Sequence, residues 1–193
     1  MDRLDKDIEL MFRFQNGEEH CFEELVERHK QRVFNIAYRY AANVHDAEEI
    51  AQQVFINIYN AKQKYKPTAQ FTTWLYQICK NTCLKSFRKK KLKIISIHSN
   101  TDFERYVLSH QALNSKAINP RDITLNNELN MIIKEAVRSL PDKQRIVLVL
   151  RIDEDLSYEN ISEVTGFSIK AVKSLLHRAR IGLKDKLKDY LTK

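Results

Sequence analysis

Glycine and proline are scarce in this chain, with three residues of each among 193. Both residue types interrupt helices, whereas the abundant Leu, Ile, Lys and Glu occur readily in them. The composition therefore predicts an all-α protein. A chain of this length can form one domain or two small ones, each with a modest hydrophobic core.

The patterns of common active sites are also missing. The chain has no glycine-rich loop of the kind that holds phosphates, and its six histidines are scattered without a paired carboxylate or a ligand cluster. An enzymatic function therefore has little support, and no cofactor is expected.

Cysteine is rare as well. Cys21, Cys79 and Cys83 are odd in number and fall among apolar positions at helical spacing, which predicts buried free thiols. Cys79 and Cys83 lie one helical turn apart and could share a metal ion, but no second Cys or His pair accompanies them. We therefore expect no metal site.

Hydrophobic targeting segments are absent from the sequence. The N-terminus has no basic and then apolar signal, and no apolar run is long enough to span a bilayer. These features predict a cytoplasmic protein that does not insert into a membrane.

Positive charge, in contrast, is in excess. The formal net charge is +8 and the pI is near 9.3, which indicates a polyanionic partner, although charge alone would also fit a membrane surface. Acidic residues gather in residues 1–27, whereas residues 85–93 and 170–188 are strongly basic. This segregation indicates separate surfaces for separate partners.

Residues 156–180 have the pattern of a helix-turn-helix. Ser157 can cap a short helix, Gly166 can supply the left-handed turn, and Ser168 can cap a second helix. In the second helix, an apolar stripe faces inward and basic residues lie outside it; the stripe comprises Ile169, Val172, Leu175, Leu176 and Ala179. Such a unit can place its second helix in a DNA major groove, although a helical hairpin with a solvated basic face would look similar.

A second polar row lies on the helix expected from Phe71 onward. At about 100° per residue, Gln77, Asn81, Lys85 and Arg88 share one narrow outward face, which continues into a basic cluster. A solvated helix end would tolerate any polar mixture. Amides followed by bases, with no acid nearby, favour a surface that contacts base edges and then phosphates.

Polar residues are expected at several helix ends. Asp46 is placed to cap a helix that starts near residue 45, and Asp142 to cap the helix after Pro141. The hydroxyl of Ser162 can bond a carbonyl one turn back.

The order of these segments predicts two small helical domains joined by a flexible linker. Residues 96–121 are richer in Ser, Asn and Gln and lose clear periodicity, which is typical of a linker. The domains would then span residues 1–95 and 122–193, and the second would contain the helix-turn-helix.

Three stretches together resemble the extracytoplasmic-function (ECF) subfamily of bacterial RNA polymerase sigma factors. Residues 46–55 look like that family's polymerase-binding helix, residues 71–76 with Asn81 and Thr82 like its promoter-melting segment, and residues 140–180 like its C-terminal promoter reader. The resemblance implies sigma regions two and four on the two domains. Their partners would be core RNA polymerase, through the clamp helices of its largest subunit, promoter DNA, and an anti-sigma factor.

The resemblance also implies roles for individual residues. Core-polymerase contacts fall on Asp46, Glu49, Gln52, Gln53 and Asn57. Contacts with the minus-ten element fall on Lys66, Gln70, Gln77, Asn81, Lys85, Arg88 and Lys89. Contacts with the minus-thirty-five element fall on Ser168, Lys170, Ala171, Lys173, Ser174, His177, Arg178 and Arg180. Gln53 departs from the acid common in the family, which leaves one ionic contact with the clamp open.

Another class of function fits part of the same sequence. A free-standing, dimeric helix-turn-helix regulator would use the same basic reader helix, but nothing in the chain resembles a receiver domain. It would also leave the N-terminal half of the chain without a role.

Overall fold

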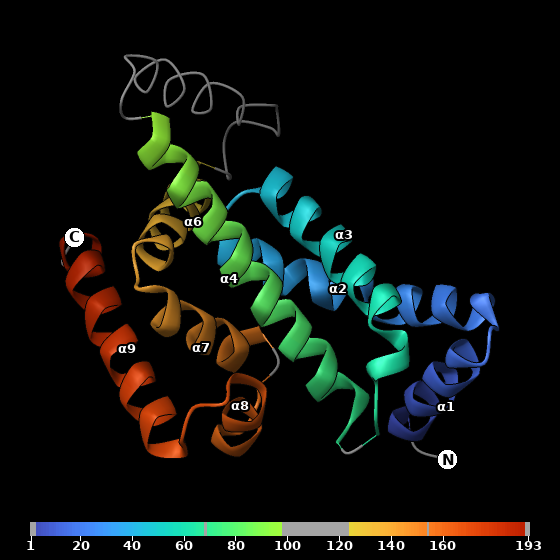
Figure 1. Ribbon diagram of the computed structural model, residues 1–193. Coiled ribbons are helices and arrows are strands. Elements are labelled where there is room, and N and C mark those ends of the chain that lie inside the picture. Colours follow the sequence, from blue (N-terminus) through green and yellow to red (C-terminus); the bar gives the residue numbers. More distant parts are fainter. Residues whose placement is uncertain (1–2, 68, 98–123, 154, 192–193) are drawn as a thin grey trace.

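The computed structural model describes the backbone of residues 3–67, 69–97, 124–153 and 155–191, and the regular elements in these ranges are all helices. The prediction of an all-α fold is confirmed. The elements, labelled in Figure 1, are α1 (Arg3–Gln15), α2 (Glu19–Ala41), α3 (Val44–Asn60), the short 3₁₀ helix η1 (Lys62–Lys64), α4 (Phe71–Ile97), α6 (Thr124–Arg138), α7 (Asp142–Asp153), α8 (Tyr158–Thr165) and α9 (Ile169–Leu191).

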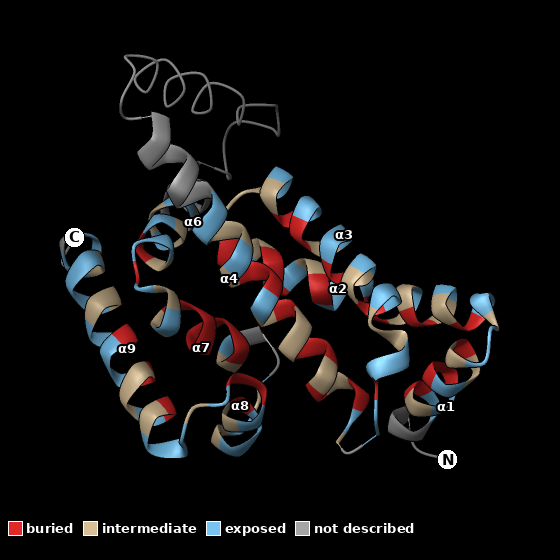
Figure 2. Cartoon of the chain, viewed as in Figure 1, coloured by how far each residue is buried: buried red, intermediate tan, exposed pale blue. Residues whose placement is uncertain are grey.

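The first half of the chain is a bundle in which α1, α3 and α4 all pack against α2. Apolar residues three and four positions apart face its centre, where Figure 2 shows the buried faces of these helices meeting. The buried set includes Met11, Phe14, Leu25, Val33, Ile36, Tyr40, Ile50, Val54, Ile58 and Leu75. Each such side chain contributes about 1.5–3 kcal/mol by leaving water.

The second half is built around α7. Residues Ile146 to Leu150 are all buried, because α8 and α9 pack on one side of this helix while α2 lies on another. Gly182 of α9 allows the side chain of Leu140, in the turn between α6 and α7, to approach closely, since a Cβ atom at this position would lie 3.3 Å from a methyl group of Leu140. The two halves are in contact, with α7 against α2 and α8 against α4 (Figure 1).

Three details differ from the sequence-based expectations. Asn43, not Asp46, caps α3, and its side chain accepts from the backbone N–H of Asp46 at 2.8 Å. Asp142 is the first residue of α7 and directs its carboxylate to Arg145, while the carbonyl of Pro141 accepts the first backbone bonds of the helix. Ile169, expected inside, is 38% exposed because it begins α9 at the edge of the core.

The helix α4 extends to Ile97, two residues into the predicted linker. Residues 98–121 of that linker lie outside the described residues. No helix within the described ranges is both long enough and apolar enough to cross a membrane.

A buried ionic cluster joins α1 to α2. Asp7 is 5% exposed and accepts from Nε of Arg28 at 2.7 Å and from Nε2 of His29 at 2.9 Å. Burial raises the pKa of Asp7, but the hydrogen bond and charge of His29, and then those of Arg28, outweigh this and leave the pKa below its usual value.

Replacing Asp7 with Ala should destabilise the protein by about 3 kcal/mol, because it leaves the half-buried guanidinium of Arg28 and the buried ring of His29 without their carboxylate partner. The free energy of unfolding, measured in urea at neutral pH, tests this. Glu9→Ala is the matched control, since Glu9 is an exposed acid on the same helix; its effect should stay within about 0.5 kcal/mol.

The difference in the free energy of unfolding between wild type and Asp7→Ala should shrink as the pH is lowered. Because the folded pKa of Asp7 is lowered from 3.8, its contribution is complete above that value and disappears as pH falls through the lower folded pKa. A stability difference that grows on acidification would contradict this assignment.

Candidate nucleic-acid interface

The helix-turn-helix forms as the sequence predicts. The hydroxyl of Ser157 accepts from the N–H of Asn160 at 3.1 Å, and Gly166 ends α8 in the left-handed conformation at φ 75°. Ser168 then accepts from the N–H of Ala171 at 3.2 Å and caps α9. Each cap satisfies a backbone donor that the helix start leaves unpaired.

The turn between α8 and α9 is closed by hydroxyl groups. Ser162 donates to the carbonyl of Phe167, across the turn, at 2.6 Å, so the expected bond one turn back is wrong for this residue. The hydroxyl of Thr165 instead donates to the carbonyl of Ile161, one turn back, at 2.6 Å. The Ser162 bond thereby ties the turn to the end of α8.

The reader helix α9 presents a continuous polar surface. Its exposed residues include Ser168, Lys170, Lys173, His177, Arg178 and Arg180, whereas Ala171 and Ser174 are half-buried. Nζ of Lys173 lies 5.5 Å from the centre of the Tyr158 ring, which is a cation-π contact that holds the side chain beside α8. All predicted reader residues therefore lie together on or beside one face.

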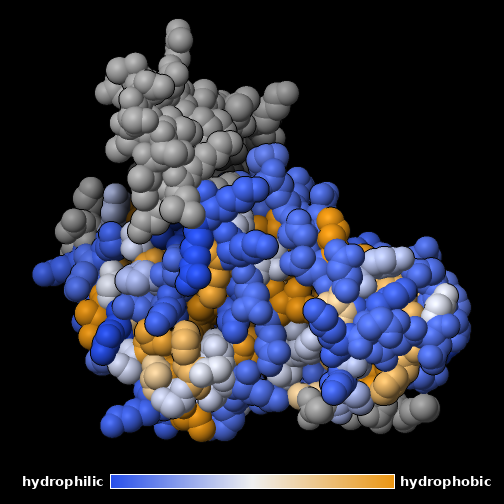
Figure 3. All heavy atoms as spheres, viewed as in Figure 1, coloured by the Kyte–Doolittle hydropathy of each residue, from blue (hydrophilic) through white to orange (hydrophobic). Residues whose placement is uncertain are grey.

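The polar row on α4 is only partly free. Asn81, Lys85, Arg88 and Lys89 are exposed, as predicted. Gln77 is half-buried, and its amide donates to the carbonyl of Glu163 in α8 at 3.3 Å. Figure 3 shows a largely hydrophilic surface along the course of α4, with smaller hydrophobic patches on both sides.

The loop before α4 is anchored by the N-terminal helix. Nε2 of Gln15 donates to the carbonyls of Lys62 at 2.6 Å and Tyr65 at 3.1 Å, and the amide of Gln63 donates back to the carbonyl of Gln15 at 3.2 Å. The buried Tyr65 ring packs against Trp74 with centroids 4.9 Å apart, so Trp74 helps to build the loop's apolar base. Burial raises the pKa of Tyr65 to about 12, with a smaller contribution from the charge of Asp7.

Beyond this anchor, Lys66 and Gln70 are exposed. Asn81 lies ten residues after Phe71, about 15 Å along the helix axis at about 1.5 Å per residue. The exposed residues of the loop and Asn81 therefore lie at separate positions along α4, not side by side.

The predicted polymerase face on α3 has an exposed part and a half-buried part, which are linked by a hydrogen bond from the amide of Gln53 to that of Asn57 at 3.0 Å. Glu49, Gln52 and Gln53 are exposed, and Glu49 lies 3.4 Å from His45. Asn57 is half-buried and donates to the hydroxyl of Thr82 in α4 at 3.0 Å. Asp46 accepts from the amide of Asn43 at 2.8 Å and so stabilises the start of α3.

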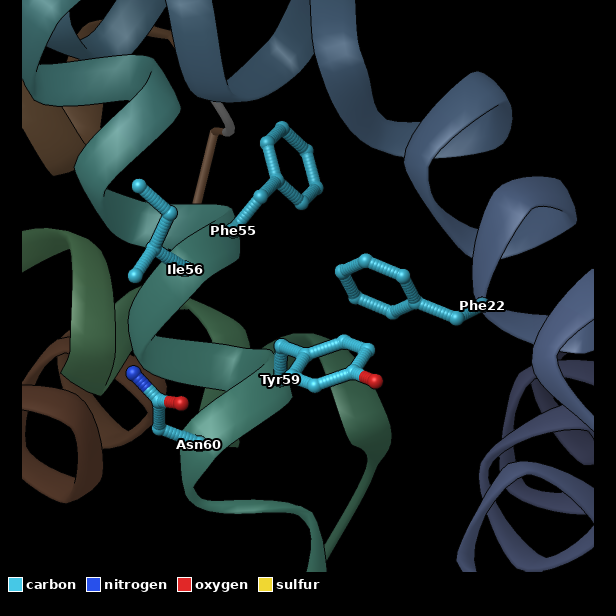
Figure 4. Close-up of a pocket in the computed structure, with 5 residues that line it drawn as sticks. All are labelled: Phe22, Phe55, Ile56, Tyr59 and Asn60. Carbon is cyan, nitrogen blue, oxygen red and sulfur yellow. The ribbon is translucent and has the colours of Figure 1, made fainter. Parts of the chain in front are cut away.

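An apolar hollow of about 330 Å³ lies beside this face and was not predicted. Figure 4 shows Phe22 of α2 turned toward Phe55 and Tyr59 of α3, with Ile56 and Asn60 completing the lining. Ile56 is 50% and Tyr59 41% exposed. The sequence signal was present in Ile56, an apolar residue outside the buried stripe of its helix.

The three cysteines are buried and none forms a disulfide, as predicted. Within the described residues, the group with potential metal-ligand geometry is Glu18, His20 and Cys21, whose donor atoms lie within 4.8 Å of one another. The guanidinium of Arg13 already binds Glu18 at 2.6 Å and lies 3.4 Å from His20, so a cation in this position would be repelled. Burial raises the pKa of the Cys21 thiol, which further opposes metal binding.

The chain matches two protein families in order. Residues 25–93 match the family described as Sigma-70 region 2, and residues 130–181 match Sigma-70, region 4. Among curated relatives, the ECF RNA polymerase sigma factor SigW of Bacillus subtilis (strain 168) is 32% identical over 173 residues, which cover 90% of this chain and 92% of that protein.

Solved structures share the fold. CnrH in complex with the cytosolic domain of CnrY matches with a TM-score of 0.67 and 22% identity, covering 96% of this chain and 99% of that one. The sigma factor RpoE in complex with the anti-sigma factor NepR from Bartonella quintana matches with a TM-score of 0.64 and 20% identity, covering 86% and 96%.

The anchoring of the loop by Gln15 can be tested directly. Gln15→Ala should increase amide hydrogen exchange in residues 62–67 by about fivefold or more, because it removes two hydrogen bonds worth about 1 kcal/mol each. Gln31→Ala is the control, since Gln31 is an exposed amide on α2 whose side chain donates to Asn35 in the same helix. Unchanged protection in residues 62–67 would show that the aromatic packing of Tyr65 is sufficient.

Proposed function

The chain belongs to the ECF sigma factors of bacterial RNA polymerase, and on this premise we propose that it binds core polymerase, opens the minus-ten element with its first half and reads the minus-thirty-five element with its second. The observation that carries the proposal is the ordered pair of region 2 and region 4 matches, together with a relative 32% identical across 90% of the chain. These matches give the first half a role that the free-standing regulator leaves unexplained.

Core polymerase would bind the exposed face of α3. Glu49, Gln52 and Gln53 are available to the clamp helices, and Ile56 extends the same face into the apolar hollow. Asp46 and Asn57 would act mainly by holding this helix in place, because their side chains already bind Asn43 and Thr82.

The minus-ten element would follow the path from the loop to the basic end of α4. Lys66 and Gln70 lie at the start of this path, Asn81 lies in its middle, and Lys85, Arg88 and Lys89 lie beyond. An exposed amide can hydrogen-bond an unstacked base, and the cations beyond it can neutralise the strand's phosphates. Gln77 could join this path only after releasing the carbonyl of Glu163.

The minus-thirty-five element would be read by α9 in the major groove. Lys173 and Ser174, near the N-terminal end of the helix, are placed for base edges, while Lys170, Arg178 and Arg180 are placed for phosphates. Ser168, Ala171 and His177 complete the surface.

An anti-sigma factor is a further proposed partner. The RpoE structure that shares this fold is described as bound to the anti-sigma factor NepR, and CnrH as bound to the cytosolic domain of CnrY. The chain would have no catalytic activity of its own and would act with the polymerase in the cytoplasm.

The overall function is tested by co-elution with core polymerase followed by run-off transcription on genomic fragments. We expect the chain to co-elute with core and to confer transcripts that core alone does not make. Glu49→Lys with Gln52→Ala should reduce co-elution, whereas Lys184→Ala, an exposed change on α9, should not. Failure of the wild-type chain to bind core would overturn the proposal.

The role of Asn81 is tested by separating promoter opening from duplex binding. Asn81→Ala should slow opening about five- to tenfold, the loss expected from one hydrogen bond to an unstacked base, and leave initial duplex binding unchanged. Permanganate reactivity of the minus-ten thymines and a gel shift measure the two steps. Asn35→Ala, an exposed amide on α2, is the matched control; equal losses in both steps would show that Asn81 does not act on the opened strand.

A further inference from the structure

An aromatic ring beside the reader helix is contacted by two cations. Tyr158, the first residue of α8, is half-buried and packs against the hydrophobic core. Nζ of Lys173 lies 5.5 Å and Cζ of Arg151 lies 5.6 Å from the centre of its ring. Both distances fall within the range of cation-π attraction, about 6 Å. The Tyr158 ring therefore joins the last turn of α7 to the reader helix α9.

Arg151 is itself held by the turn that leads into α8. Its Nη1 donates to the carbonyl of Leu156 at 2.6 Å and to that of Asp155 at 3.3 Å, and lies 3.2 Å from the Asp155 carboxylate. Asp155 adopts a left-handed φ of 45°, so the backbone turns sharply at this point. The guanidinium thus closes the turn and contacts the ring at the same time, which limits the positions that the ring can take.

A carboxylate at the start of α8 attracts the ammonium of Lys173 as well. The pKa of Glu159 lies below its usual value, chiefly because its carboxylate accepts from its own backbone N–H and from the hydroxyl of Ser157; the charge of Lys173 lowers it further. The aromatic ring and the carboxylate both belong to the first turn of α8. Lys173 is therefore drawn toward this turn by two kinds of interaction.

The other cations of the reader surface differ from Lys173 in this respect. The side chains of Lys170, Arg178 and Arg180 are exposed and make no ring contact, hydrogen bond or ion pair with a residue that the structure describes. Such side chains suit phosphates, which attract a cation without reading sequence. A base edge offers its acceptors at fixed places, so a cation that reads it benefits from being held in advance.

We propose that Tyr158 is a positioning residue for promoter reading, whose ring holds the ammonium of Lys173 toward O6 and N7 of one guanine in the minus-thirty-five element. Arg151 and Glu159 keep the ring and the ammonium in place. The inference rests on the function proposed above, because it concerns how α9 reads that element. It adds a determinant of base preference that lies outside the reader helix and acts through Lys173.

Selection of promoter sequences by the chain on core polymerase tests this role. A pool of promoter fragments randomised over the minus-thirty-five element is bound, and sequencing of the bound fraction gives the preference at each base pair. Tyr158→Leu removes the ring and keeps apolar bulk, so it should lower the preference for guanine at one base pair about two- to fivefold, the loss of one exposed cation-π contact. Tyr158→Phe keeps the ring and should match wild type. Lys173→Met should relax the same base pair.

A double variant identifies the group through which the ring acts. Tyr158→Leu in the Lys173→Met background should cause no further change in base preference, because the ammonium that the ring holds is gone. Phe167→Leu is the matched control, since Phe167 is a half-buried ring whose cation contact, 5.7 Å from Nζ of Lys143, lies outside the reader surface. It should keep the wild-type preference.

A second readout needs no polymerase. An ammonium held over a ring places the neighbouring ε-methylene protons in the ring current. The NMR resonances of these protons of Lys173 in the free chain should therefore shift in Tyr158→Leu and stay in place in Tyr158→Phe. Lys170, an exposed lysine three residues earlier, gives the reference signal. Unchanged Lys173 resonances in Tyr158→Leu would overturn the proposal.

The outcomes separate the two proposals. If the wild-type chain on core selects a sequence and Tyr158→Leu selects it equally well, the positioning role is overturned and the sigma function stands. Equal weakening on all sequences by Tyr158→Leu and Tyr158→Phe would also overturn the positioning role, because it would indicate that the hydroxyl contacts a phosphate. A wild-type chain that selects no sequence on core would overturn the proposed function itself, and the positioning role with it.

Discussion

The burial of α2 on several sides at once is the constraint on which the rest of the structure depends. This helix contacts α1, α3 and α4 of its own half and also α6 and α7 of the other. Leu25, Val33, Ile36 and Tyr40, spaced along its length, are nearly inaccessible to water. Every surface with a proposed function lies on a helix that packs directly on α2 or on one of its neighbours.

Buried polar groups then specify how the helices meet. Asp7 can be satisfied only where Arg28 and His29 reach it, so it sets the position of α1 along α2. Gln15, at the end of α1, in turn reaches the carbonyls of Lys62 and Tyr65. Apolar packing tolerates small shifts of one helix along another. A shift that leaves a buried charge or carbonyl without its partner costs free energy. The N-terminal helix thereby supports the loop at the start of the proposed strand path.

The two proposed DNA surfaces account for the basic segments of the chain, residues 85–93 and 170–188. The proposed polymerase face on α3 carries Glu49, Gln52 and Gln53, while the proposed DNA faces on α4 and α9 carry exposed lysine and arginine side chains. A sigma factor needs both, because it must join a protein and a polyanion at once. Gln77 and Lys80 of α4 also donate to the carbonyls of Glu163 and Val164 in α8, so the two halves of the chain are in direct polar contact.

Helix periods, the caps at Ser157 and Ser168, the turn at Gly166 and the exposed row from Asn81 to Arg88 could all be predicted, because their hydrogen bonds and faces are set within a few residues of sequence. Local reasoning failed where neighbouring residues competed, as when Asn43 rather than Asp46 capped α3. Only the tertiary structure decided that Gln77 binds Glu163 and that Arg145 is buried against Tyr40, partners 86 and 105 residues away. Which distant carbonyl lies within reach of a side chain depends on how whole helices pack, and no local sequence pattern encodes that.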